Sequence, residues 1–232
     1  MIEDGQGLAA LFGDPGTGKS SLLRYLASEY ADEALYTTGF LTRVDFNSPF
    51  AFTKRISEDF GIGPQRSLAA QNSALEDFLM NEHEAERNVI LFLDEGHMLS
   101  FELLEVIRNL LNFETNERKL IQVVVAGQME LLERIRQKRT MRSFASRIFS
   151  PVLVEAMNVD ETIAMVQFRC ERARIECPFS DEALRAIYSR TKGVPREVLK
   201  VCAHAVKAFP EKFQPYDIDA VMQRASRVQV AV

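Results

Sequence analysis

The stretch LFGDPGTGKSSLLRYL, residues 11–26, decides the fold of this chain. Within it, residues 13–20 fit the pattern G-x-x-x-x-G-K-[ST] at each specified position. Apolar residues 8–12 predict a strand before the pattern, and leucines at helical spacing predict a helix over residues 19–30 behind it. Strand, glycine-rich loop and helix in this order are typical of a loop that wraps a phosphate chain.

The chemistry of phosphate binding explains why glycines occupy this loop. A phosphate chain must approach the backbone closely, and some loop residues must take positive φ. The loop amides then act as anion donors, helped by the positive end of the helix that begins near Gly18. Lys19 is predicted to contact the β- and γ-phosphates of ATP, and the Ser20 hydroxyl to bind Mg²⁺. The residues predicted to contact the nucleotide here are Gly13, Asp14, Pro15, Gly16, Thr17, Gly18, Lys19, Ser20 and Ser21. The alternative, a turn that only joins a strand to a helix, is disfavoured by the complete pattern and its flanks.

A second motif, VILFLDEGH, spans residues 89–97. It predicts a buried strand with two carboxylates at its carboxyl end, where ligands of open α/β sheets bind. We expect Asp94 to hold Mg²⁺ and Glu95 to polarise the attacking water, since phosphoryl transfer needs an oriented nucleophile. An acidic turn or helix cap is the alternative. DEGH also resembles the DEAH box of helicases, but the chain is too short for two helicase cores, and His97 is expected to be an ordinary residue at a helix start.

Two single residues complete the predicted site. In VVVAGQMELLERI, residues 123–135, the strand should lie between those of the first two motifs. That places Gln128 beside the γ-phosphate, although a helix-capping amide is the alternative. In TKGVPREVLK, residues 191–200, Arg196 falls in the first turn of a helix. A cation there opposes the helix dipole, so an anionic partner is predicted.

Residues 134–147 hold six basic residues and no acidic one. Arg147 is the predicted arginine finger, reaching the γ-phosphate bound by a neighbouring subunit. The others are candidates for nucleic-acid phosphates or a subunit interface: Arg134, Arg136, Lys138, Arg139 and Arg142. A solvated charged face is the alternative.

Apolar runs predict five strands, at residues 8–12, 40–46, 88–94, 119–127 and 150–156. Helical patterns lie between them, so we expect an α/β fold with a mainly parallel sheet and helices on both faces. After residue 156 the patterns are helical only, which predicts a core over 1–156 and a helical lid over 157–232. The helix signals in the lid are Asn158 with Glu161, Ser180, Gly193, Pro195, and Pro215 with Asp217.

Composition excludes several classes of protein. Of the 232 residues, 47% are hydrophobic and 26% charged, as in ordinary globular proteins. A net charge of −5 argues against coating of nucleic acid by bulk charge. Three cysteines without CxxC spacing fit a reducing compartment. No apolar run reaches membrane-spanning length and no charged-then-apolar leader opens the chain, so a cytoplasmic protein is expected.

These pieces, in this order, resemble an AAA+ ATPase. The segments IRNLLNFET, KLIQVVVAGQMEL and GVPR look like the ExeA-type ATPases of bacterial secretion operons, to which transposition ATPases of the TniB and MuB kind are related. The resemblance implies a P-loop core with strand order 5-1-4-3-2 and a helical lid. It also implies sensor roles for Gln128 and Arg196, and a ring or filament of identical subunits. Members usually carry several tens of residues before the first strand, where only MIEDGQG stands here, so a trimmed chain or a different adenine contact is expected.

Three functional hypotheses follow. The first is a Mg²⁺-dependent ATPase whose ATP state is coupled to an assembly, with a secretion or transposition protein as partner. The second is an adaptor that binds DNA under the control of ATP, which the basic run favours. The third is a scaffold that retains the loop without nucleotide, against which Asp94, Glu95 and Arg196 argue.

Overall fold

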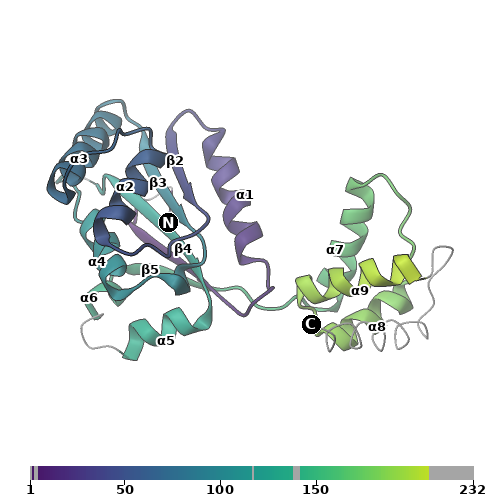
Figure 1. Cartoon of the computed structure of the whole chain (residues 1–232). Helices are drawn as coiled ribbons and strands as arrows, with labels where there is room; N and C mark the ends of the chain where they lie inside the picture. Colours follow the sequence, from purple (N-terminus) through teal and green to yellow (C-terminus); the bar gives the residue numbers. More distant parts are fainter. Residues whose placement is uncertain (1, 3–4, 117, 138–141, 209–232) are drawn as a thin grey trace. The chain divides into compact units, whose positions relative to one another are not determined.

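The computed structural model describes residue 2 and residues 5–116, 118–137 and 142–208. The chain forms two compact units. Of the described residues, one unit contains those up to Gly13 and from Lys19 to Val154, and the other contains Asp14–Gly18 and those from Glu155 on. In the described residues of the first unit, one parallel sheet has the order β2-β3-β4-β1-β5, which confirms the expected 5-1-4-3-2 order (Figure 1).

The strands of this sheet are β1 (Leu8–Phe12), β2 (Tyr36–Leu41), β3 (Asn88–Leu93), β4 (Ile121–Gly127) and β5 (Ile148–Leu153). The helices around it are α1 (Lys19–Ala31), α2 (Pro49–Asp59), α3 (Leu68–Glu84), α4 (Phe101–Leu110), α5 (Met129–Gln137) and α6 (Arg142–Ala145). A 3-10 turn, η1 (Gly96–Met98), follows β3. Strand β4 lies between β3 and β1, as the sequence predicted.

The predicted strand over residues 40–46 was wrong in its position. Strand β2 pairs along Tyr36–Leu41 with Asn88–Leu93, and β3 ends where Leu93 meets Leu41. Beyond this point no partner strand remains, so the chain leaves the sheet. The apolar pattern of the predicted strand has another cause, because Val44 is fully buried in a loop.

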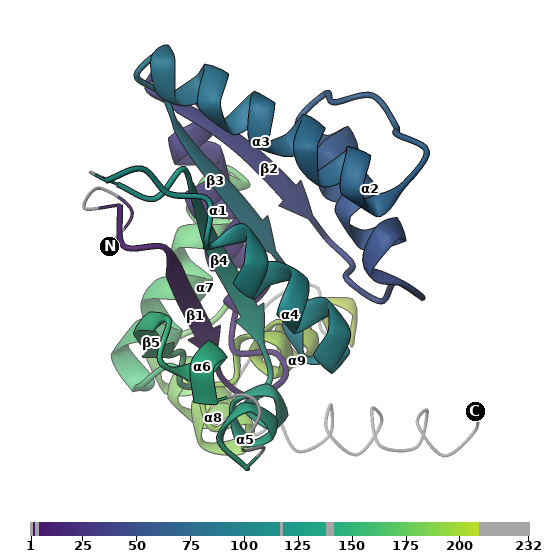
Figure 2. The same ribbon diagram turned by 90° about the vertical axis from the view of Figure 1, so that its left-hand side faces the viewer.

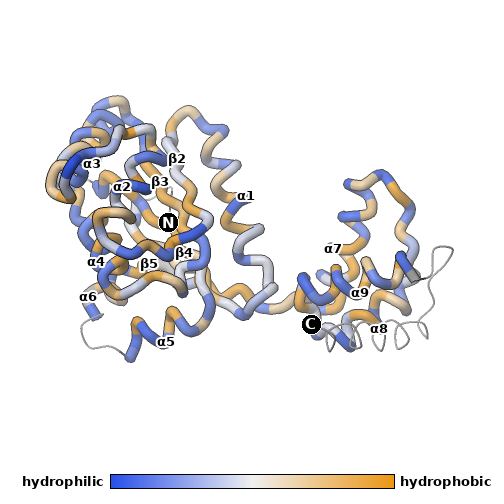
Figure 3. The backbone as a smooth tube through the Cα atoms, viewed as in Figure 1, coloured by the Kyte–Doolittle hydropathy of each residue, from blue (hydrophilic) through white to orange (hydrophobic). Residues whose placement is uncertain are grey.

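Alternate strand residues face two separate apolar clusters, as the period of two in a strand requires. Val89, Leu91 and Leu93 of β3 pack with residues of α2, α3 and α4. Ile90 and Phe92 pack on the other face with residues of α1. The two views agree that α1 and the α2–α4 group cover opposite faces (Figures 1 and 2). Hydrophobic residues accordingly concentrate along β3 and β4 (Figure 3).

The second unit contains α7 (Val159–Arg172), α8 (Asp181–Thr191) and α9 (Pro195–Ala208). Asn158 and Glu161 form the predicted capping box, with bonds of 2.8 and 2.9 Å. Ser180 caps α8, and Pro195 opens α9. Buried apolar residues of all three helices form one small core. The helix predicted at Pro215 and Asp217 lies outside the described residues.

Among the residues that the structure describes, none of the helices has both the length and the apolar character needed to cross a bilayer.

Candidate functional site

The glycine-rich loop connects the end of β1 to the first residue of α1. Gly16 and Gly18 have φ of +87° and +102°, a region that residues with a side chain rarely adopt. The buried Lys19 donates from Nζ to the carbonyl oxygen of Gly13 across 2.9 Å, and so closes the loop on itself. This arrangement fits a phosphate chain, because the Lys19 ammonium lies against the first residue of the loop and the backbone amides at the start of α1 have no partner within the helix.

Ser20 and Asp94 meet although 74 positions separate them in sequence. Ser20 Oγ donates to Asp94 Oδ1 across 3.0 Å, and Asp94 is only 4% exposed. The same carboxylate oxygen accepts the N–H of Glu95 at 2.9 Å. Hydroxyl and carboxylate oxygens side by side are suitable Mg²⁺ ligands, so these two residues fit the predicted metal.

Glu95 directly follows the strand end in an unusual backbone conformation. Its φ and ψ are 54° and 35°, the left-handed region that few residues other than glycine occupy. Its side chain is 49% exposed, unlike that of Asp94. Strain of this kind is held in place by surrounding structure and occurs often at functional sites.

His97 lies between Glu95 and Gln128, a role that the sequence analysis did not assign to it. Its ring Nε2 is 3.1 Å from the amide Nε2 of Gln128. Its ring Nδ1 is 3.4 Å from Glu95 Oε2. Gln128 follows β4, next to β3 in the sheet, and this neighbourhood brings the two segments together.

The structure corrects one interpretation of the basic run. The Arg134 guanidinium donates to the carbonyl oxygens of His97 and Leu99 at 2.7 and 2.8 Å. It also lies 5.1 Å from the centre of the Phe101 ring. Arg134 is therefore an internal link, and its prediction as a phosphate or interface contact was wrong. Arg136 and Arg142 are exposed, whereas Lys138 and Arg139 lie outside the described residues.

Arg147 directly precedes β5. Because Ile148 pairs with Leu8 at the start of β1, Arg147 lies at the amino-terminal ends of the strands, whereas the glycine-rich loop follows the carboxyl end of β1. It lines a cavity of about 380 Å³ together with Lys119. Burial lowers the pKa of the Lys119 amine, and the nearby Arg147 charge lowers it further. Lys119 also pairs with Glu114. Two cations thus share one opening at this edge.

Arg196 belongs to the second unit, as does the middle of the glycine-rich loop. Its backbone N–H donates to the carbonyl oxygen of Gly16 across 3.3 Å. A Cβ on Gly16 would lie 3.0 Å from Arg196 Cβ and 3.2 Å from Val194 Cγ1. Gly16 therefore has two reasons to lack a side chain, its positive φ and this close approach.

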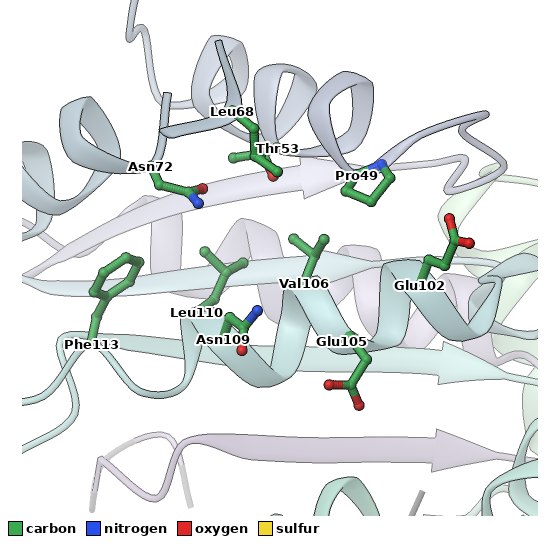
Figure 4. A pocket seen from close by; sticks show the side chains of 10 residues that line it. All are labelled: Pro49, Thr53, Leu68, Asn72, Glu102, Glu105, Val106, Asn109, Leu110 and Phe113. Carbon is green, nitrogen blue, oxygen red and sulfur yellow. The ribbon is translucent and has the colours of Figure 1, made fainter. Parts of the chain in front are cut away.

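A separate cavity of about 350 Å³ lies between α2, α3 and α4 (Figure 4). The residues that line it are Pro49, Thr53, Leu68, Asn72, Glu102, Glu105, Val106, Asn109, Leu110 and Phe113. None of them belongs to the predicted nucleotide site.

Comparison with known families defines the class of this protein. The family described as "AAA domain" matches residues 2–135, more than half of the chain. The chain belongs to this family of AAA+ P-loop ATPases. Its family and fold together support ATPase activity.

The chain is similar to General secretion pathway protein A of Aeromonas hydrophila, with 30% identity over 211 residues. The match covers 89% of this chain but only 38% of that protein. This finding confirms the resemblance to the ExeA-type group.

Solved structures of the same fold include the ORC2 protein of Aeropyrum pernix in ADPNP and ADP complexes. It has a TM-score of 0.68 at 15% identity, covering 96% of this chain and 63% of that one. The Walker-type ATPase paby2304 of Pyrococcus abyssi has a TM-score of 0.66 at 14% identity, covering 98% and 68%.

Proposed function

We propose that this chain binds ATP with Mg²⁺, hydrolyses it, and couples its ATP state to the assembly of several copies. The observation that carries the proposal is the Ser20–Asp94 hydrogen bond beside the buried Lys19. A phosphate-binding loop and a metal-binding acid then share one strand-end edge, as phosphoryl transfer requires.

In this proposal each residue of the loop edge has a distinct task. The loop amides from Gly13 to Ser21 and the Lys19 ammonium bind the phosphates. Ser20 and Asp94 would hold Mg²⁺, which when bound would supply positive charge beside the transferred phosphoryl group. Lys19 would exchange its bond to Gly13 for phosphate oxygens when nucleotide enters.

The remaining residues act on the water and the γ-phosphate. Glu95 is exposed enough to accept a proton from an attacking water. Gln128 presents an amide at the end of the neighbouring strand, where it orients water or senses the phosphate. Arg196, within the proposed lid of residues 157–232, is proposed to sense the nucleotide. Its N–H bond to Gly16 supports this role.

Arg147 is proposed to act on the nucleotide bound by a neighbouring copy. The five residues of β1 separate its end of the sheet from the loop by about 17 Å, at ~3.3 Å per residue. It is therefore too far from the site of its own subunit to contact the phosphates. A ring or filament would bring it to the site of the next subunit.

The decisive test compares ATP binding and phosphate release in wild type, Glu95→Gln and Lys19→Ala. Glu95→Gln should bind ATP with Kd within about twofold of wild type and lose on the order of 100-fold in turnover. Lys19→Ala should lose binding and turnover together. Wild-type turnover in Glu95→Gln would remove that residue from its role.

A mixing experiment tests the action of Arg147 in trans. Glu95→Gln and Arg147→Ala should each be nearly inactive alone. In a mixture, Arg147→Ala subunits keep Glu95 and receive an arginine from their neighbours, so part of the activity should return. Arg142→Ala, an exposed neighbour on α6, is the control and should hydrolyse ATP alone. A mixture as inactive as its components would contradict action in trans.

A second candidate function is DNA binding controlled by ATP, favoured by the exposed Arg136 and Arg142 in a run without acids. Affinity for duplex DNA should rise with an ATP analogue and fall steeply with salt. Absence of binding at low salt would reject this candidate.

The similarity to General secretion pathway protein A makes a secretion assembly the first partner to test. The free cysteines favour a cytoplasmic setting.

A further inference from the structure

A continuous polar path runs from the strand-end glutamate to the strand-end amide through one imidazole. Glu95 Oε2 lies 3.4 Å from His97 Nδ1, and His97 Nε2 lies 3.1 Å from Gln128 Nε2. The side chain of His97 is 15% exposed, so this ring is mostly shielded from water. Its Nδ1 is buried and has no hydrogen-bond partner among the described groups, although the Glu95 carboxylate lies within 3.4 Å of it.

The path has a direction, because an amide nitrogen can only donate. With the Gln128 amide in this orientation, His97 Nε2 must accept and therefore carries no proton. The proton of a neutral ring is then on Nδ1, the nitrogen that faces the Glu95 carboxylate. One tautomer thus satisfies both neighbours at once, and the other leaves two donors facing each other at Gln128.

Two glycines allow the ring to reach Gln128. A Cβ on Gly96 would collide with Val125 Cγ1 and come within 3.1 Å of the Ala126 carbonyl oxygen. A Cβ on Gly127 would lie 3.2 Å from the His97 backbone nitrogen. The turn after β3 is therefore pressed against the end of β4 at a distance that side chains would not allow.

Arg134 holds this turn from the other side. Its guanidinium binds the carbonyl oxygens of His97 and Leu99, and so fixes the backbone that carries the ring. Arg134 lies on α5, the helix that starts immediately after Gln128. Gln128 and the contact that holds the turn of His97 consequently both belong to the short segment from β4 to α5.

We propose that His97 is a positioning residue that couples Gln128 to Glu95, so that contact of Gln128 with the γ-phosphate changes the placement of the Glu95 carboxylate. This inference rests on the proposed function, in which Gln128 and Glu95 act on the γ-phosphate and the water. It assigns to His97 a task beyond that function and gives Arg134 the task of holding the turn.

The coupling follows from the two N–H groups of the Gln128 amide. One can donate to a phosphate oxygen while the other still donates to His97 Nε2. A bound γ-phosphate then fixes the amide and, through it, the orientation of the ring. The Nδ1–H of His97 faces the Glu95 carboxylate and holds it towards the attacking water only when a γ-phosphate is present.

The kinetic test uses three substitutions of His97 and measures kcat, KM and ATP affinity separately. His97→Phe keeps the ring shape without polar atoms, and should lower kcat by about tenfold with ATP Kd unchanged. His97→Asn keeps a donor near the Nδ1 position and should recover part of kcat, whereas His97→Leu should not. His204→Phe, on an exposed position of α9, is the control and should match wild type.

Non-additivity distinguishes coupling from two independent roles. If Gln128 acts on Glu95 through His97, then His97→Phe should lower kcat by no more than about twofold in a Gln128→Ala background. A full tenfold loss in that background would overturn the coupling while leaving Glu95 and ATP hydrolysis intact.

A measurement without nucleotide tests the geometry independently of any turnover. The chain has three histidines, so the ring nitrogens can be assigned by NMR with His97→Asn as reference. The proton of the neutral His97 ring should be on Nδ1, and Gln128→Ala should reduce that population. A proton on Nε2 in wild type, or spectra unchanged by Gln128→Ala, would overturn the inference even if the protein hydrolyses ATP. The expected tautomer in an inactive wild type would uphold the contact and reject the proposed function.

Discussion

Ser20 Oγ donates a hydrogen bond to Asp94 Oδ1 at 3.0 Å, which joins the first turn of α1 to the end of β3. The pair is held within the first unit, and Asp94 is almost fully buried. If Asp94 also binds Mg²⁺, as proposed, it should lose that ability when its charge is removed.

Asp94→Asn should keep the fold and abolish the effect of Mg²⁺ on nucleotide binding. The amide oxygen can still accept from Ser20, but it carries no negative charge. The ratio of ATP Kd values measured in EDTA and in Mg²⁺ should fall from at least about tenfold in wild type to near one. Asp45→Asn, an exposed change at the Arg43–Asp45 pair, is the control and should keep the wild-type ratio. An unchanged ratio in Asp94→Asn would exclude this carboxylate as a metal ligand.

Gly96→Ala should destabilise the first unit by about 1–3 kcal/mol, since a methyl group has no space against β4. Gly63→Ala is the matched control, because a Cβ there would meet nothing within 4 Å and its backbone needs no positive φ. Urea unfolding of both variants measures the difference. Equal stability would show that the turn after β3 can move away from β4, which would also weaken the role assigned to His97.

The sequence indicated which residues belong to the candidate site better than it indicated which of their side chains contact each other. Residues 13–20, Asp94 and Glu95 could be recognised because a local motif with a strand before it carries its own chemistry. His97 could not, since its role depends on two strands that are adjacent only in the folded sheet. Gly96 offered the available signal, a glycine directly after the acidic pair.

The fold was predicted where periodicity matched burial. The strand prediction at residues 40–46 was wrong because Val44 is buried in a loop and so gives an apolar pattern like that of a strand. The length of β3 decides where β2 ends. Helix α2 was not predicted, although Ser48 caps it and Pro49 opens it, two signals that sequence alone provides. Arg134 was predicted to contact nucleic-acid phosphates or a neighbouring subunit, because sequence does not reveal which carbonyl groups of the fold accept from its guanidinium.

Glu82 should make stability depend on acid pH. Hydrogen bonds from Arg87 lower the pKa of its carboxyl, burial opposes them, and the Thr37 hydroxyl lowers the pKa further. Because the pKa in the folded chain lies below that in the unfolded chain, the unfolded state binds more protons as pH falls. The stabilisation is thus complete above the unfolded pKa of about 4.3 and is lost as pH drops through the folded value.

Glu82→Gln should therefore be less stable than wild type at pH 7, and the gap between them should narrow as pH falls below about 4. Urea unfolding at several pH values measures the gap. Glu84→Gln, exposed on the same helix, should lie within about 0.5 kcal/mol of wild type at pH 7. A gap that stays constant down to pH 3 would show that the Arg87 and Thr37 contacts do not shift the Glu82 carboxyl.

Thr53 and Thr162 are two buried threonines whose hydroxyl groups have opposite surroundings. Both are fully buried, but Thr53 Oγ1 has no hydrogen-bond partner among the described residues, whereas Thr162 Oγ1 donates to the Asn158 carbonyl oxygen at 2.8 Å. Valine has nearly the same shape as threonine and lacks the hydroxyl. Thr53→Val should then be neutral or stabilise by about 1 kcal/mol, because a desolvated polar group is removed. Thr162→Val should destabilise by about 1 kcal/mol, because a carbonyl oxygen loses a donor. Denaturant unfolding of both variants measures the two free energies of unfolding. If Thr53→Val loses as much stability as Thr162→Val, the cavity beside Thr53 holds a water bound to its hydroxyl.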